Sequence, residues 1–141
     1  MEERISPNTI LESVPLFKGF GSEGLKAVLN SSKDMVFRAG ETIVKEGEAG
    51  LGLYVILDGQ ALVKRKGKTI AKLGRGNFFG ELALLDNQPR SADVIAVEQT
   101  KCLVLLRWDF WSLVEKDKTI VRQLLQEMAR RQRAADVALS E

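Results

Sequence analysis

The chain has 141 residues, a length that fits one domain with enough apolar side chains for a buried core. It contains no histidine and one cysteine, which excludes catalytic Ser-His-Asp or Cys-His arrangements, an internal disulfide and a zinc site of the usual ligands. Its net charge of +2 is too small to indicate nucleic-acid binding by itself. We therefore expect neither a hydrolase of these classes nor a metalloenzyme.

The sequence also lacks the features of membrane insertion or export. No apolar run is long enough to cross a bilayer, and the residues after Met1 do not resemble a signal peptide. The single Cys102 lies in a predicted strand and is better explained as a small buried side chain than as a reactive thiol. These observations predict a cytoplasmic protein in which residues 1–141 form a single domain.

Residues 6–32 are expected to form N-terminal helices. The first helix has Ser6 or Asn8 as its N-cap and ends before Pro15, and the second has Ser22 as its N-cap. The apolar residues on their buried sides recur at helical spacing: Ile10, Leu11, Val14, Leu25, Val28 and Leu29.

Residues 33–106 change to short β-prone runs separated by glycine-bearing turns. The predicted strands are Met35–Phe37, Thr42–Val44, Leu53–Leu57, Ala61–Lys64, Thr69–Leu73, Asp93–Val97 and Lys101–Leu106. Asp58-Gly59 and Lys66-Gly67-Lys68 are typical of hairpin turns. Many short strands without intervening helices indicate a jelly-roll β-barrel or a sandwich, so the fold class is mainly β with flanking helices.

A basic run, Lys64 to Lys68, covers the second predicted hairpin, with Lys72 and Arg75 close in sequence. It suggests either a nucleic-acid-binding patch or a solvated edge. No aromatic side chains alternate with the charges, as they do in many single-strand-binding surfaces. Charged side chains also keep an edge strand from pairing with other chains, which is the simpler explanation.

Residues 107–139 are expected to form the C-terminal helices. A short helix runs from Arg107 to about Glu115, and its aromatic residues should pack on the end of the barrel. Asp117 then caps a long helix. One apolar stripe runs along that helix, formed by Ile120, Val121, Leu124, Leu125 and Met128. Beyond Met128 the helix becomes rich in arginine.

The stretch Phe79 to Asp93 reads F-G-E-L-A-L-L-D-N-Q-P-R-S-A-D. Gly80 permits a tight turn, and the helix-competent residues after it would gather free backbone N–H groups that attract an anion. Arg90 adds a guanidinium that can donate two hydrogen bonds to phosphate oxygens. Because a carboxylate repels phosphate, Glu81 would instead bind a sugar hydroxyl or a nearby arginine. These residues together predict a site for a compact nucleotide.

This stretch resembles the phosphate-binding cassette of cyclic-nucleotide-binding domains, of the catabolite-activator and protein kinase A regulatory subunit type. The family pattern is Phe-Gly-Glu, two or three apolar residues, a short turn and then Pro-Arg-Ser/Thr-Ala, and this sequence matches each position. A weaker likeness extends from about Val14 to Ala138. One departure is Leu51, which stands where the family often carries an acidic residue.

The resemblance implies a role for each matching residue. Arg90 would hold the cyclic phosphate with donors from Ser91, and Glu81 would accept from the ribose 2′-hydroxyl. The long C-terminal helix resembles the lid helix of the family, whose later part faces the base of the ligand. Arg131 would reach the pocket from this lid helix, or the arginine-rich end would be solvated. The implied ligand-binding residues are Gly80, Glu81, Leu82, Ala83, Arg90, Ser91, Ala92, Val63, Ala71, Leu73 and Arg131. Of these, the four aligned with the base pocket could equally be barrel core: Val63, Ala71, Leu73 and Ala83.

The resemblance implies a sensor, not an enzyme, that carries no metal or cofactor. It would bind cyclic AMP, or less favourably cyclic GMP, and report occupancy by moving its C-terminal helix. The expected partners are the cyclic nucleotide and an unidentified protein effector, with a homodimer through the stripe 120–128 as a further expectation. Since the sequence stops at Glu141 with no helix-turn-helix after the lid helix, we expect no direct nucleic-acid binding. The alternatives are an interaction domain that has lost its ligand, or the sensor fragment of a DNA-binding transcription regulator.

Overall fold

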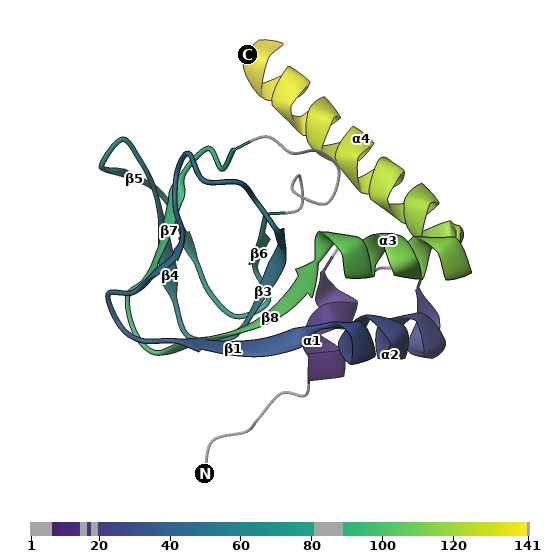
Figure 1. Ribbon diagram of the computed structural model, residues 1–141. Helices are drawn as coiled ribbons and strands as arrows, with labels where there is room; N and C mark the ends of the chain where they lie inside the picture. The colour runs from purple at the N-terminus through teal and green to yellow at the C-terminus, as the bar shows by residue number, and fades with distance from the viewer. Residues whose placement is uncertain (1–6, 15–16, 18–19, 81–88, 141) are drawn as a thin grey trace.

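The computed structural model describes residues 7–14, 17, 20–80 and 89–140, and Figure 1 shows two sheets with helices to one side. Each sheet has four strands, and every pairing is antiparallel. The first sheet has the order β1 (Lys33–Phe37), β8 (Thr100–Leu106), β3 (Gly52–Asp58), β6 (Phe78–Phe79). The second has the order β2 (Thr42–Val44), β7 (Asp93–Ala96), β4 (Ala61–Arg65), β5 (Lys68–Leu73).

All the strands expected from the sequence are present, which confirms the mainly β fold class with flanking helices. The strand β1 is longer than expected and starts at Lys33, which pairs with Val104 of β8. Its first residues are exposed and polar, so they carry no alternation that a sequence pattern could detect. In the described residues, hydrogen bonding joins the strands into two separate sheets.

The four helices of the described chain are α1 (Pro7–Ser13), α2 (Gly21–Ser31), α3 (Arg107–Lys116) and α4 (Thr119–Ser140). Two expected N-caps are wrong: Asn8 lies inside α1, and α2 already begins at Gly21, which places Ser22 in its first turn. The other candidate cap of α1, Ser6, lies outside the described residues. The expected cap of the long helix is confirmed, because Asp117 Oδ1 accepts hydrogen bonds from the backbone N–H of Thr119 at 3.0 Å and from its hydroxyl at 2.7 Å.

Two clusters of buried side chains form the core. Strands β3 and β8 separate them, because alternate residues of a strand point to opposite faces. The helix-facing cluster contains Ile10, Leu11, Val14, Phe17, Leu25, Val28, Leu53, Val55, Leu57, Leu103, Leu105, Phe110, Leu113, Val114 and Ile120. The cluster between the sheets contains Phe37, Ile43, Ile56, Ala61, Phe79, Val94, Ala96, Cys102 and Val104. Cys102 is fully buried, as the sequence predicts.

The aromatic residues of α3 do not all pack on the sheets as expected. Phe110 is buried, but Trp108 is 55% exposed and Trp111 is 41% exposed. The helix rests on the core through the side that carries Phe110, Leu113 and Val114, and a helix can bury only one side against one layer. The prediction was therefore wrong for the two tryptophans.

The long helix α4 runs away from the end of α3 (Figure 1). Three side chains of its apolar stripe are described: Ile120 is 4% exposed, Val121 is half-buried, and Leu125 is 62% exposed. No helix in the described ranges is both long and apolar enough to span a membrane.

Candidate ligand-binding site

The backbone of Arg90 is fixed by the loop that follows β2. Its N–H donates to the carbonyl oxygen of Glu48 at 2.8 Å, and its own carbonyl oxygen accepts from Gly47 at 2.9 Å. A β-bridge between Ala49 and Pro89 continues this pairing. Arg90 therefore lies in an extended segment whose backbone is hydrogen-bonded, and not in an unsupported loop.

The side chain of Arg90 turns toward the start of β3. One terminal nitrogen, Nη2, donates to the carbonyl oxygen of Gly52 at 2.9 Å. The guanidinium carbon lies 5.8 Å from the centre of the Tyr54 ring, within the range of a cation–π contact. The residue is half-buried, so its permanent charge stands at the boundary between the protein and the solvent.

Gly80 lies against this guanidinium. Its φ of +86° belongs to the left-handed region, as expected for a tight turn after β6. A Cβ atom at this position would collide with a terminal nitrogen of Arg90 and would lie 2.6 Å from the carbonyl oxygen of Gly52. Glycine is thus required here both for the turn and for the close approach of the arginine.

The middle of the predicted cassette falls outside the described residues. This applies to Glu81, Leu82 and Ala83, so their expected amide and carboxylate contacts stay predictions. The two flanks of the cassette, Gly80 and Arg90, are brought together by the structure. This proximity is what a cassette that surrounds an anion requires.

The end of the cassette is tied to neighbouring segments. Ser91 is exposed, and its carbonyl oxygen accepts from Nε of Arg65 at 3.2 Å. Ala92 is buried. Asp93 accepts from the backbone N–H of Glu46 at 2.6 Å, and a carboxylate oxygen of Glu46 accepts from the backbone N–H of Lys66 at 3.3 Å. The basic hairpin between β4 and β5 is thereby joined to the segment that carries Arg90 and Ser91.

The described residues predicted for the base pocket share one face of the second sheet. In the register of β4 with β5, Val63 is opposite Ala71, and Ala61 is opposite Leu73. Directly opposite residues of an antiparallel pair point to the same face. Val63 and Leu73 are half-buried against the cluster between the sheets, whereas Ala71 is exposed. The inner face of the second sheet is the one that faces the cluster between the sheets. The interpretation as barrel core is wrong for Ala71, because its side chain is exposed on this inner face.

The two side chains that carry the lid prediction, those of Met128 and Arg131, lie outside the described residues. The backbone of both residues belongs to α4. The basic hairpin is consistent with a solvated edge, since β5 is the outermost strand of its sheet and both Lys68 and Lys72 are exposed.

Sequence reasoning missed two residues beside Arg90. Gly52 contributes through its carbonyl oxygen, which has no sequence signature. Tyr54 contributes its ring, which stacks on Phe79 with a centre-to-centre distance of 5.0 Å and an angle of 6°. Burial raises the pKa of the Tyr54 phenol above its ordinary value, while the positive charge of Arg90 acts in the opposite direction. Strand alternation could have placed Tyr54 on the same face as Ile56, but not next to an arginine.

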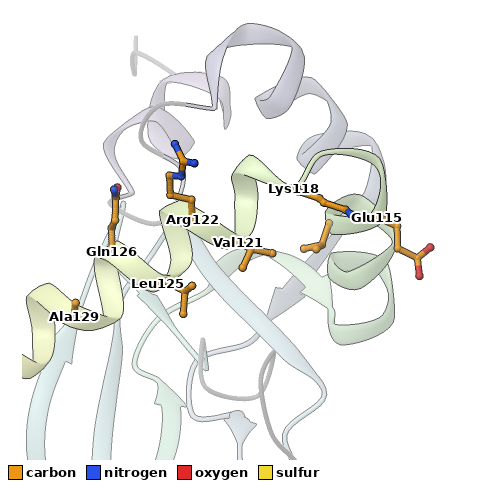
Figure 2. Close-up of a pocket in the computed structure, with 8 residues that line it drawn as sticks. Glu115, Lys118, Val121, Arg122, Leu125, Gln126 and Ala129 are labelled. Carbon is orange, nitrogen blue, oxygen red and sulfur yellow. The ribbon is translucent and has the colours of Figure 1, made fainter.

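A second concave feature, a shallow open groove of about 700 Å³, lies between α3 and α4. Figure 2 shows Val121 and Leu125 projecting to one side of α4, with Arg122 and Gln126 directed elsewhere. The groove is lined by Val114, Glu115, Lys118, Val121, Arg122, Leu125, Gln126 and Ala129. None of the described cassette residues, 79–80 and 89–93, lines this groove. Among the described residues, no group of three side chains could hold a metal ion.

The family model of the cyclic nucleotide-binding domain matches residues 34–117, which include the whole of the predicted cassette. The chain belongs to the cyclic nucleotide-binding domain family. The expected family is therefore confirmed, and the strands and α3 are the part of this domain that the family model covers.

Relatives of this cyclic nucleotide-binding domain include a receptor protein and a protein kinase. The Cyclic AMP receptor protein of Thermus thermophilus is 34% identical over 134 residues, 92% of this chain and 62% of that protein. The cGMP-dependent protein kinase of Eimeria tenella is 41% identical over 97 residues, 69% of this chain and 10% of the kinase. The chain thus spans less than two thirds of either relative.

Solved structures agree with this assignment. The N-terminal domain of a transcriptional regulator from Streptomyces coelicolor superimposes with a TM-score of 0.84 and 29% identity, covering 94% of this chain and 95% of that one. The likeness covers the helices as well as the sheets.

Proposed function

We propose that the chain is a cyclic-nucleotide sensor that binds cyclic AMP in preference to cyclic GMP, with the cyclic phosphate on Arg90. The observation that carries this proposal is the half-buried guanidinium of Arg90, held by Gly52 and Tyr54 beside Gly80. A planar, permanently charged fork in this position suits a phosphate that bears one negative charge.

The remaining contacts follow from the family pattern. The Ser91 hydroxyl and the amides near Leu82 and Ala83 would add donors to the phosphate, and Glu81 would accept from the ribose 2′-hydroxyl. The base would lie against the inner face that carries Val63, Ala71 and Leu73. The exposure of Ala71 supports this placement, because a base could cover it without displacing the buried core.

The preference for cyclic AMP rests on Ser91. Members of the family that favour cyclic GMP commonly carry threonine directly after the arginine, where its hydroxyl meets the guanine amino group. Serine has the hydroxyl but not the methyl group that restricts its rotamer. The relatives include both a cyclic AMP receptor and a cGMP-dependent kinase, so they do not favour either base. Displacement of cyclic AMP by an equal or lower concentration of cyclic GMP would overturn this preference.

Binding of the nucleotide would be reported by a population shift of α4. The start of α4 is held by the core through Ile120 and Val121, whereas Leu125 is 62% exposed, so at Leu125 the helix can move without breaking a buried contact of that side chain. Ligand would favour the arrangement with the helix over the base, and it can shift the equilibrium only by its differential affinity for that arrangement. The output would reach a protein effector rather than DNA. Retention of duplex DNA by the chain on filters at moderate salt would argue against that output.

We also propose a homodimer through α4. Leu125 is 62% exposed in the groove between α3 and α4, next to the apolar side chains of Val114 and Val121. A second copy of α4 would cover these apolar side chains. A dimer would let one occupied pocket alter the position of the neighbouring lid.

Substitution of Arg90 tests the proposed function. Calorimetry with cyclic AMP should show that Arg90→Ala weakens binding by about 150-fold or more, since a phosphate that loses its half-buried charged partner costs about 3–5 kcal/mol. Arg75→Ala is the matched control, because that arginine is exposed and pairs with Asp58. A folded Arg90→Ala variant that binds within about tenfold of the unaltered chain would contradict the cassette assignment; tenfold corresponds to about 1.4 kcal/mol.

A further inference from the structure

Tyr54 occupies a defined position beside the arginine. It is the only tyrosine in the chain, and the register of β3 with β6 places it directly opposite Phe79. The two rings stack, and Phe79 is itself buried. The neighbours of Tyr54 along β3, Leu53 and Val55, are buried on the opposite face of the strand and hold its backbone in place. The strand and the stacking on Phe79 therefore place the ring independently of its contact with the arginine.

A long arginine side chain loses about 2 kcal/mol of rotamer entropy when it is held in one conformation. At Arg90 three features restrict this freedom before any ligand arrives: the carbonyl oxygen of Gly52, the ring of Tyr54, and the close approach of Gly80. A cation–π contact uses none of the five N–H donors of a guanidinium. The ring can thus direct the arginine without competing with phosphate oxygens for its hydrogen bonds.

We propose that Tyr54 is a positioning residue whose aromatic ring holds the guanidinium of Arg90 in the orientation that receives the ligand phosphate. The inference rests on the proposed function, and it adds a residue outside the cassette to the site. The ring is the active feature and the hydroxyl is not, because the contact is made to the ring face.

Affinities for cyclic AMP of Tyr54→Phe and Tyr54→Leu test this role in the full chain. Tyr54→Phe retains the ring and should bind within about threefold of the unaltered chain. Tyr54→Leu should bind about 5- to 20-fold more weakly, the range expected for loss of a partly desolvated cation–π contact. If the leucine variant does not fold, Tyr54→Met replaces it as an adaptable apolar substitute.

A double-mutant cycle separates positioning from a general effect on the fold. In the Arg90→Lys background the fork is already lost, so Tyr54→Leu should weaken binding by less than about threefold there. Equal losses in both backgrounds would overturn the proposal, as would a Tyr54→Leu variant that binds like the unaltered chain. A Tyr54→Phe variant as weak as Tyr54→Leu would also overturn it, because the hydroxyl would then be required.

A ligand-free measurement keeps this proposal separate from the proposed function. Since Tyr54 is the only tyrosine, growth with 3-fluorotyrosine gives one ¹⁹F resonance from this ring. That resonance should shift in Arg90→Lys and stay unchanged in the control Arg75→Lys. An unaltered chain that binds neither cyclic nucleotide contradicts the proposed function, whereas a ¹⁹F resonance insensitive to Arg90→Lys contradicts the contact itself.

Discussion

The backbone N–H of Glu46 donates a hydrogen bond of 2.6 Å to Oδ1 of Asp93, although the two residues are 47 positions apart. The same loop accepts and donates the backbone hydrogen bonds of Arg90 through Glu48 and Gly47. The segment that carries the proposed phosphate ligand is therefore aligned along this loop, and Asp93 secures its end at the start of β7.

We expect Asp93→Ala to lower the free energy of unfolding by about 1–3 kcal/mol, because the Glu46 N–H loses its charged acceptor in a partly buried position. It should also weaken cyclic AMP binding, since the segment of Arg90 would be less well aligned. Asp93→Asn keeps an acceptor oxygen and should retain most of both properties. Urea unfolding and calorimetry measure them. Unchanged stability and affinity in Asp93→Ala would show that the hydrogen bond does not align the site.

Gly80 and Gly67 form a matched pair for the close approach at the site. Both have positive φ, +86° and +80°, so alanine at either position carries a backbone cost of about 1–2 kcal/mol. A Cβ at Gly67 meets no atom within 4 Å, whereas at Gly80 it meets the guanidinium of Arg90. Gly80→Ala should therefore be the more destabilising variant by urea unfolding, and only Gly80→Ala should weaken cyclic AMP binding. Equal effects of the two substitutions on binding would contradict the close approach.

The sequence pattern predicts the strands because β3 and β8 are short apolar runs, which are buried on both faces, and because glycine marks the turns between strands. It could not predict which side of α3 would face solvent, since Trp108, Phe110 and Trp111 are all large apolar residues at one helix start. It could also not predict the surroundings of Arg90. The acceptor on Gly52 is a backbone atom, and the approach of Tyr54 depends on the tertiary packing of the 89–93 segment against β3.

Cys102 offers a test of burial and of pH dependence. Burial raises the pKa of its thiol from 9.0 to about 12, so the folded chain keeps the thiol protonated over a range in which the unfolded chain ionises. The resulting stabilisation is complete below about pH 9 and is lost as pH rises from about 9 to 12. Urea unfolding across this range should show a smaller decline for Cys102→Ala than for the unaltered chain. Equal declines would contradict the raised pKa.

The groove between α3 and α4 predicts a concentration-dependent dimer. Leu125→Glu places a charge at its exposed apolar centre and should shift sedimentation toward the monomer. Gln126→Glu is the matched control, because it adds the same charge at a polar position of the groove. An unaltered chain that is monomeric at all concentrations tested would remove the dimer from the mechanism.

The last prediction concerns the end of α4. If Met128 faces the sheets when ligand is bound, a period of 3.6 residues returns Arg131 to nearly the same side and leaves Arg130 well off it. Arg131 could then contact Glu81 or the face of the base, which would connect the position of the helix to an occupied pocket. Deletion from Arg130 onward should leave a folded chain with weakened cyclic AMP binding.

Arg131→Ala should reproduce most of that loss, and Arg130→Ala serves as its neighbouring control with the same change of charge. Calorimetric titrations of the three variants separate contact from general electrostatics, since a loss of positive charge alone would affect both arginines equally. Equal affinities of the truncated and full chains would mean that this end of α4 is solvated. Binding of the nucleotide would then have to be transmitted through the earlier part of α4, where Ile120 is buried and Val121 packs against the helix-facing cluster.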